Sequence, residues 1–245
     1  MFSLHKSLLL AAAVGSLAIL PSCDDDVEIV DLELEVRMAP GGVDYVAGDT
    51  YTINGKAVQF SSLSFYLTDP SVTGGGTTFA TDAYVLAKPN TSVVVGQVES
   101  GDYSSFTFNL GIDSATNHAD PTTYPTDNVL APQSPNHHWS WASGYIFLRI
   151  DGMFDGDGDG TPETAFETHL GTDNFYTPLT LNGTVEGHDD HVHVELVFDP
   201  IALYDGTNFG SDASDDMTFT THTMDNMPMA MMIRSNFANA FSLGN

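Results

Sequence analysis

Two histidines alternate with apolar residues in the segment 191–195 (His-Val-His-Val-Glu). If this segment is a β-strand, His191, His193 and Glu195 point to one face and the valines point to the core. Two imidazoles at positions i and i+2 can bind one metal ion of borderline softness, such as copper or zinc. The alternative is a solvated strand face that contains histidines by chance, although His188 just upstream favours a metal site.

A second segment, residues 137–141 (His-His-Trp-Ser-Trp), contains both tryptophans of the chain. On an extended backbone Trp139 and Trp141 share one face, as core or cross-strand aromatic residues also would. A metal ion on the histidine pair of the first segment needs a further ligand from another strand. We expect the tryptophan segment to supply it through His137 or His138, which predicts one copper site built from both segments.

An acidic run, residues 155–163 (Asp-Gly-Asp-Gly-Asp-Gly-Thr-Pro-Glu), has the composition of a calcium loop. Asp at positions 1, 3 and 5 and Gly at position 6 match the opening of an EF-hand loop. Position 12 is Phe166, so the bidentate Glu is missing and a shorter loop is expected. The alternative is an acidic turn, although without a cation its carboxylates would repel one another. The predicted calcium ligands are Asp155, Asp157, Asp159, the Thr161 carbonyl and Glu163.

The segment 222–232 (His-Thr-Met-Asp-Asn-Met-Pro-Met-Ala-Met-Met) is rich in methionine. Thioether sulfur is a soft ligand that suits Cu(I). The same spacing is typical of a helix that buries methionine, with Pro228 in its first turn. Because Ile233 and Phe241 continue the apolar stripe, we expect a helix over residues 224–241 rather than a metal site.

Charge and cysteine content exclude several classes of protein. The chain has 33 acidic and 6 basic residues, a net charge of −27, so it cannot grip nucleic acid or an anionic membrane surface through cations. The single cysteine excludes disulfides, and we expect it to lie outside the mature fold, which excludes thiolate metal sites and cysteine nucleophiles. No familiar catalytic motif is present, so we expect a protein that is not an enzyme.

Residues 1–22 have the pattern of a bacterial lipoprotein signal, with an apolar stretch that ends in Leu-Pro-Ser before Cys23. We expect Cys23 to be lipidated, residues 23–29 to form an acidic tether and residues 30–245 to form one domain. An acyl chain would anchor the protein to a membrane. This predicts a periplasmic, outer-membrane or surface lipoprotein in the cell envelope of a Gram-negative bacterium.

The rest of the chain has the pattern of many short strands. Apolar and polar residues alternate from Val30 to Met38, and Asn54-Gly55 between two apolar runs predicts a hairpin with a type I′ turn. Many short strands separated by turns are typical of an all-β protein, here a β-sandwich of mostly antiparallel strands with one short C-terminal helix. Strands are expected at 30–38, 50–60, 63–68, 77–87, 92–98, 103–110, 144–150, 165–170 and 191–198.

Several segments, taken in order, resemble the MbnP family of copper-associated exported proteins. The most specific is residues 139–147 (Trp-Ser-Trp-Ala-Ser-Gly-Tyr-Ile-Phe). The resemblance implies an all-β exported domain that is often paired with a di-haem peroxidase-like partner, MbnH. In characterised relatives this partner oxidises a tryptophan to kynurenine, and histidines together with the kynurenine bind copper. Weaker matches lie at 58–67, 108–117, 166–171 and 236–241.

Carried over position by position, the resemblance makes Trp139 or Trp141 the oxidised residue. His169 matches the histidine of a His-x-Gly motif of the family, with a structural role as the alternative. The cysteines that many members have after that glycine are absent here. The implied copper ligands are His191, His193, His138, His137 and a group derived from Trp139 or Trp141.

The combined prediction is a membrane-tethered, exported protein that binds copper without turnover and has an accessory calcium loop. Copper binding would weaken at acidic pH, because the metal needs neutral imidazoles. One alternative is a calcium-stabilised surface or adhesion module in which the histidines are incidental. The other is a metalloenzyme that uses the same histidines with an open coordination position.

Overall fold

The computed structural model describes residues 27–140 and 142–244. The expected signal peptide, Cys23, most of the tether and Trp141 lie outside the described residues, so what was predicted for them stays a prediction. The first strand, β1, begins at Ile29. Within the described ranges, no helix is long and apolar enough to cross a membrane.

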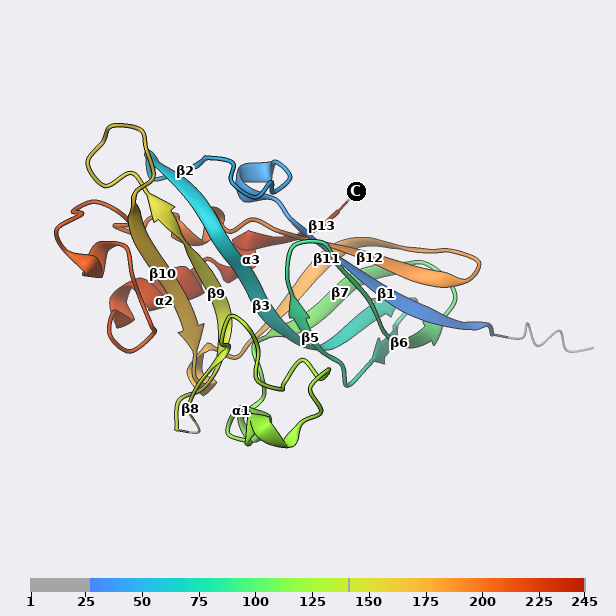
Figure 1. Ribbon diagram of the computed structural model, residues 1–245. Helices are drawn as coiled ribbons and strands as arrows, with labels where there is room; N and C mark the ends of the chain where they lie inside the picture. Colours follow the sequence, from blue (N-terminus) through green and yellow to red (C-terminus); the bar gives the residue numbers. More distant parts are fainter. Residues whose placement is uncertain (1–26, 141, 245) are drawn as a thin grey trace, which may run out of the picture.

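Strands dominate the structure and form one large sheet (Figure 1). Its main path is β10-β9-β3-β7-β11-β12-β1-β6, and β2, β4, β5, β8 and β13 pair beside this path. β1 and β12 are parallel, whereas the other paired strands of the described residues are antiparallel. The strands are β1 (Ile29–Met38), β2 (Tyr51–Ile53), β3 (Lys56–Gly74), β4 (Thr77–Ala80), β5 (Tyr84–Ala87), β6 (Thr91–Glu99), β7 (Tyr103–Leu110), β8 (His138–Ser140), β9 (Gly144–Phe154), β10 (Thr164–Gly171), β11 (Thr177–Gly187), β12 (His191–Phe198) and β13 (Phe241–Leu243).

The mostly antiparallel, β-rich character is confirmed, but the pairing does not divide the strands into the two sheets of a sandwich. The long strand β3 has 19 residues and pairs with β2, β4, β5, β7 and β9, which joins them into one sheet. The register of β3 shifts between Phe60 and Ser62 and between Thr68 and Ser71. Such bulges bend and twist a strand. They also interrupt apolar alternation, which is why the sequence indicated two short strands here.

The predicted alternation along β12 is confirmed. The apolar side chains of this strand are fully buried, whereas His191 and His193 on the opposite face are half-buried. Phe198 stacks on Phe241 with ring centroids 4.8 Å apart and meets Phe65 edge-on at 5.1 Å. This packing determines the outward direction of the histidines, because successive side chains of a strand point to opposite faces. The buried residues of β12 are Val192, Val194, Leu196 and Phe198.

The C-terminal segment contains two short helices and a strand, where the sequence predicted one helix. α2 (Met227–Ser235) begins at the cap residue Asn226, whose side chain accepts a hydrogen bond from the Met229 amide. Met229 is buried, which confirms that this helix packs methionine into the core. Asn236 ends α2, and its side chain donates to the carbonyls of Leu203 and Asp205, in and just after the 3-10 helix η4 (Ala202–Tyr204). α3 (Phe237–Ala240) follows, and β13 then pairs with β12.

Candidate metal centres

The described residues contain three groups of side chains whose ligand atoms lie within 4.8 Å of one another. Two groups combine two imidazoles with one carboxylate, and the third contains carboxylates only. The sequence predicted the histidines of the second group and the carboxylates of the third, but not the first group. The groups are Glu167, His169 and His222; Glu33, His191 and His193; and Asp155, Asp157, Asp159 and Glu163.

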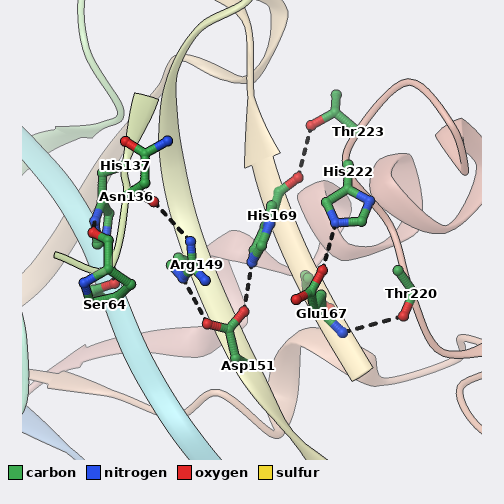
Figure 2. Close-up of polar contacts among 12 residues, drawn as sticks. Ser64, Asn136, His137, Arg149, Asp151, Glu167, His169, Thr220, His222 and Thr223 are labelled. Carbon is green, nitrogen blue, oxygen red and sulfur yellow. Dashed lines mark hydrogen bonds and ion pairs between the residues drawn. The ribbon is translucent and has the colours of Figure 1, made fainter. Parts of the chain in front are cut away.

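Strand β10 and the loop before α2 position the first group (Figure 2). Glu167 and His169 are two residues apart on β10, which puts both side chains on one face. The loop runs beside β10, because the Thr221 amide donates to the Glu167 carbonyl (2.9 Å) and the His169 amide donates to the Thr221 carbonyl (2.8 Å). The next residue, His222, is thereby held against β10, with its ring centroid 5.0 Å from that of His169.

His169 is buried and interacts with Asp151 on the neighbouring strand β9. Its Nε2 donates to Asp151 Oδ1 (2.6 Å), and Arg149 Nε donates to Asp151 Oδ2 (2.7 Å). Burial alone would raise the pKa of Asp151, but the hydrogen bonds and charges of His169 and Arg149 outweigh it and lower the pKa. The carboxylate is therefore ionised and can only accept, so the His169 Nε2 that faces it donates, and Nδ1 is the nitrogen left to bind a metal.

His222 lies between two carboxylates. Its Nδ1 donates to Asp225 Oδ2 (2.7 Å) and its Nε2 donates to Glu167 Oε2 (2.8 Å). Burial alone would lower the pKa of His222, but the hydrogen bonds to Asp225 and Glu167 outweigh it, so the pKa is raised. A metal ion bound to Nε2 would replace the proton there, while Asp225 keeps its hydrogen bond to Nδ1.

The donor set of this first group fits a borderline metal ion. Two imidazoles and a carboxylate suit Cu²⁺ or Zn²⁺. Both imidazoles also hydrogen-bond a carboxylate through the nitrogen that the metal would not use: Asp151 for His169 and Asp225 for His222. Such outer carboxylates orient the ring and raise its basicity as a ligand.

Trp139 lies at the same end of β10. A Cβ added to Gly171, two residues after His169, would come within 2.7 Å of Cζ3 of Trp139, so the indole ring covers this glycine. The Gly171 amide donates to the Thr223 hydroxyl (3.0 Å), which in turn donates to the His169 carbonyl (3.0 Å). These contacts gather the tryptophan, His169 and the loop that contains His222 around one strand end.

Glu167 and His222 were not among the ligands predicted from the sequence. Glu167 precedes His169 by two residues, the spacing that made His191 and His193 a candidate pair, so it was a usable signal. His222 could not be found in this way. The methionine pattern around it reflects the core packing of α2, and its approach to β10 depends on long-range pairing.

His137 has a structural role in this arrangement. The residue is 1% exposed, its Nδ1 donates to the Pro135 carbonyl (2.8 Å) and its Nε2 accepts from the Ser64 hydroxyl (2.8 Å). Burial lowers the pKa of His137 to about 4, and the hydrogen bond to Pro135 opposes this shift only partly. Both nitrogens are occupied, so this predicted ligand has none free for copper.

His138 differs from its neighbour in having one buried ring nitrogen, Nε2, without a hydrogen-bond partner. Its ring meets Tyr145 edge-on, with centroids 4.8 Å apart. Burial lowers the pKa of His138, whereas the negative charge of Asp120 opposes this. The imidazole is therefore held neutral beside Trp139.

The structure does not bring the predicted copper ligands to one place. His191 and His193 lie on β12, whereas His138 and Trp139 lie on β8, which pairs with β9. Strands β3, β7 and β11 separate β9 from β12 in the strand order, and β8 and β12 lie in different parts of the molecule (Figure 1). The third ligand beside His191 and His193 is instead Glu33 of the adjacent strand β1.

The acidic loop joins β9 to β10, at the end of this hairpin away from β8 (Figure 1). Asp155 is buried and accepts hydrogen bonds from the amides of Gly158 (2.6 Å) and Gly160 (2.9 Å). Asp159 accepts from the Thr161 amide (2.7 Å). The loop thus folds around its own carboxylates and brings the four predicted acidic ligands together, which fits a calcium ion.

Comparisons with known proteins agree on one family. Residues 29–225 match the sequence profile of the MbnP family. Among solved structures, "MbnP from Methylosinus trichosporium" is similar, with a TM-score of 0.55 and 15% sequence identity over 75% of this chain and 80% of that chain. At this identity the likeness concerns the fold alone. No curated protein matches the sequence.

Proposed function

Because the chain belongs to the MbnP family, we propose that it is an exported protein that binds copper beside Trp139. The ligands would be His169, His222 and Glu167. One observation supports this choice above all: the ligand atoms of these three residues lie within 4.8 Å of one another, at the strand end that Trp139 covers. Copper would be held there without turnover.

We expect Trp139 to be the tryptophan that is oxidised. The family resemblance implies a di-haem MbnH-type partner that converts a tryptophan to kynurenine. Kynurenine has a ketone oxygen and an aromatic amine, either of which could add a donor to the two imidazoles and the carboxylate. Trp139 is half-buried, so part of its ring is accessible to such a partner.

We also propose a cellular location for the protein. Export and lipidation of Cys23 would place the domain in the cell envelope of a Gram-negative bacterium, tethered to a membrane by acyl chains only. The di-haem partner would act in the same compartment.

The test is the copper content of protein isolated from its own host, compared with two variants. His169→Gln keeps a donor for Asp151 but removes the metal-binding nitrogen, and His222→Asn likewise keeps a donor for Asp225. The double variant is expected to lose one equivalent of copper, while mass spectrometry of its peptides still reports whether Trp139 is oxidised. The matched control, His191→Ala with His193→Ala, should keep copper at this site. Unchanged copper content in the His169/His222 double variant would refute the proposed site.

A second function is favoured by the loop between β9 and β10. Its four carboxylates lie within 4.8 Å of one another, and a bound calcium ion would relieve their repulsion. As an accessory site it would stabilise the copper protein. As the main site it would make the protein a calcium-stabilised surface module. That alternative predicts that calcium raises the melting temperature and that protein isolated from the host contains no copper.

A further inference from the structure

We infer that the outer face of the β1–β12 pair holds a second metal site, for a divalent transition-metal ion such as Zn²⁺ or Cu²⁺. Its ligands are His191, His193 and Glu33. This site is separate from the copper site proposed beside Trp139 and does not depend on it, because β3, β7 and β11 lie between β9 and β12.

The parallel pairing of β1 and β12 assembles the three ligands. Glu33 of β1 is paired with His193 of β12. Asp31, two residues before Glu33 on the same face of β1, is paired with His191. Paired residues on adjacent strands present their side chains to the same face. The result is that the three ligand atoms lie within 4.8 Å of one another, although the residues come from opposite ends of the chain.

The ring nitrogens that face the carboxylates are available to a metal. His191 Nδ1 donates to Asp190 Oδ1 (2.8 Å), which leaves Nε2 directed toward Glu33 Oε2 at 3.9 Å. His193 Nε2 lies 3.6 Å from Glu35 Oε2. Both separations are too long for hydrogen bonds, so neither Nε2 is occupied by a strong competing partner. The contact of His191 with Asp190 is the kind of outer carboxylate that orients a metal-binding imidazole.

The surroundings favour a cation and leave it accessible. Three more carboxylates surround the site: Asp31, Glu35 and Glu186. The positive charge of the nearby Arg37 is already paired with Glu195 (2.6 Å) and Asp44 (2.8 Å). The side chains of the two histidines are 29% and 32% exposed, so an ion from solution can reach them. His193 also lines a groove between β11, β12 and β13. The negative field of these carboxylates raises the local concentration of cations at the site.

The choice of metal follows from the donors. Carboxylates alone would suit calcium or magnesium, whereas two imidazoles select zinc, copper or nickel. The His188 ring lies 4.6 Å from the His191 ring and is a further nitrogen donor within reach of the same face. A bound ion would add a further link between β1 and β12, which already share backbone hydrogen bonds and the Arg37–Glu195 ion pair.

The test is titration of the metal-free full-length protein with Zn²⁺, followed by calorimetry. The His169→Gln/His222→Asn background removes the site beside Trp139, and calcium in excess fills the acidic loop. In this background we expect one Zn²⁺ equivalent, and we expect it to be lost when His191→Ala and His193→Ala are added. Failure of the copper proposal leaves this result unchanged, because the background already lacks that site.

A pair of charge-matched variants separates ligation from electrostatic attraction. Glu33→Gln removes a ligand and is expected to weaken Zn²⁺ binding about tenfold or more, whereas Asp31→Asn removes the same charge from the same face and should weaken it less than about threefold. Cu²⁺ bound in this background should show nitrogen hyperfine splitting from two imidazoles by electron paramagnetic resonance. Equal effects of the two variants, or full Zn²⁺ binding without His191 and His193, would overturn the inference.

Discussion

The histidines of this protein differ in what their ring nitrogens contact, and this difference decides which of them can bind a metal. His137 is buried, with one nitrogen on the Pro135 carbonyl and the other on Ser64. His169 and His222 instead contact carboxylates, which hold the ring and leave the other nitrogen for a metal, at His222 after Nε2 gives up its proton. Proximity to tryptophan in the sequence does not reveal which ring nitrogens are already engaged.

Burial of neutral His137 predicts an acid-sensitive fold. Its pKa is about 4 in the folded protein against 6.5 ordinarily, so between these values the unfolded chain binds a proton that the folded protein does not. The contribution of His137 should therefore lower stability as the pH drops from about 6.5 to about 4 and level off below that, by about 3 kcal/mol at most. Urea unfolding across this pH range, compared with that of His137→Gln, measures the effect. Parallel curves for the two proteins would contradict it.

Gly171 is the residue whose size permits the packing of Trp139. A Cβ at this position would come within 2.3 Å of the Tyr145 carbonyl oxygen and 2.7 Å of the Trp139 ring, and the first of these is backbone that cannot easily move. Gly171→Ala should therefore lower the free energy of unfolding by about 1–3 kcal/mol and displace the indole. Chemical unfolding and tryptophan fluorescence measure both effects. As a control, Gly158→Ala adds a Cβ that meets nothing within 4 Å, although its positive φ of +87° contributes a smaller strain of its own.

Among the elements, the loop between β9 and β10 is held by hydrogen bonds from its own amides to its carboxylates. Asp155 is buried and accepts from two loop amides, whereas the exposed Asp157 accepts only from the Asp159 amide (3.1 Å). The two aspartates therefore make different contributions to the loop, although both would be calcium ligands.

Calcium should raise the melting temperature of the protein, and a chelator should lower it. A ligand at a hundredfold excess over its Kd contributes about 2.7 kcal/mol. Asp157→Asn is expected to remove most of this response while leaving the metal-free protein nearly as stable. Asp155→Ala is expected to cost about 1–3 kcal/mol even without calcium, since two loop amides lose their acceptor. Thermal melts with calcium and with chelator test both. A melting temperature that calcium leaves unchanged would leave only an acidic turn.

The C-terminal strand β13 packs into the hydrophobic core through Phe241. Phe241 contacts Phe65, Phe108 and Phe198, with ring centroids 4.8–5.4 Å apart. Phe241→Ala should cost about 3–5 kcal/mol in unfolding free energy, because it removes a buried ring and leaves a cavity. The exposed Met232 offers a control, for which Met232→Ala should change stability by about 0.5 kcal/mol or less. Urea unfolding compares the two, and similar small costs would mean that β13 frays in solution.

For the molecule as a whole, the net charge of −27 makes attraction to an anionic membrane surface unfavourable. We therefore expect any membrane association to come from lipidation of Cys23, the one cysteine of the sequence. An acyl chain adds about 0.8 kcal/mol of membrane affinity for each buried methylene group, which suffices against this repulsion when more than one chain is attached.

Cys23→Ala should accordingly release the protein from membranes into the soluble fraction of the cell envelope. Fractionation of the native host, with detection of the protein by antibody, gives the readout. Intact mass of the membrane-bound protein should include the acyl groups. A variant that still sediments with membranes would show that another part of the chain, or a partner, provides the anchor.

Local patterns in the sequence determined much of the fold. β7 and β12 have the predicted bounds, and the Asn54-Gly55 turn has the two positive φ angles (50° and 83°) that a type I′ turn needs. The acidic loop also assembles as expected, since its ligands lie within a few residues of one another. In contrast, β11 was missed, because Pro178 and Gly183 interrupt its apolar alternation.

The tertiary structure alone decided which histidines share a site. The pattern of His191 and His193 showed that both leave one face of a strand, but only the pairing of β12 with β1 showed that Glu33 stands beside them. Likewise, His222 reaches His169 because a loop runs along β10, far from it in sequence. Side-chain direction is a local property of the backbone, whereas the neighbour across a sheet depends on strand order, which the whole core decides.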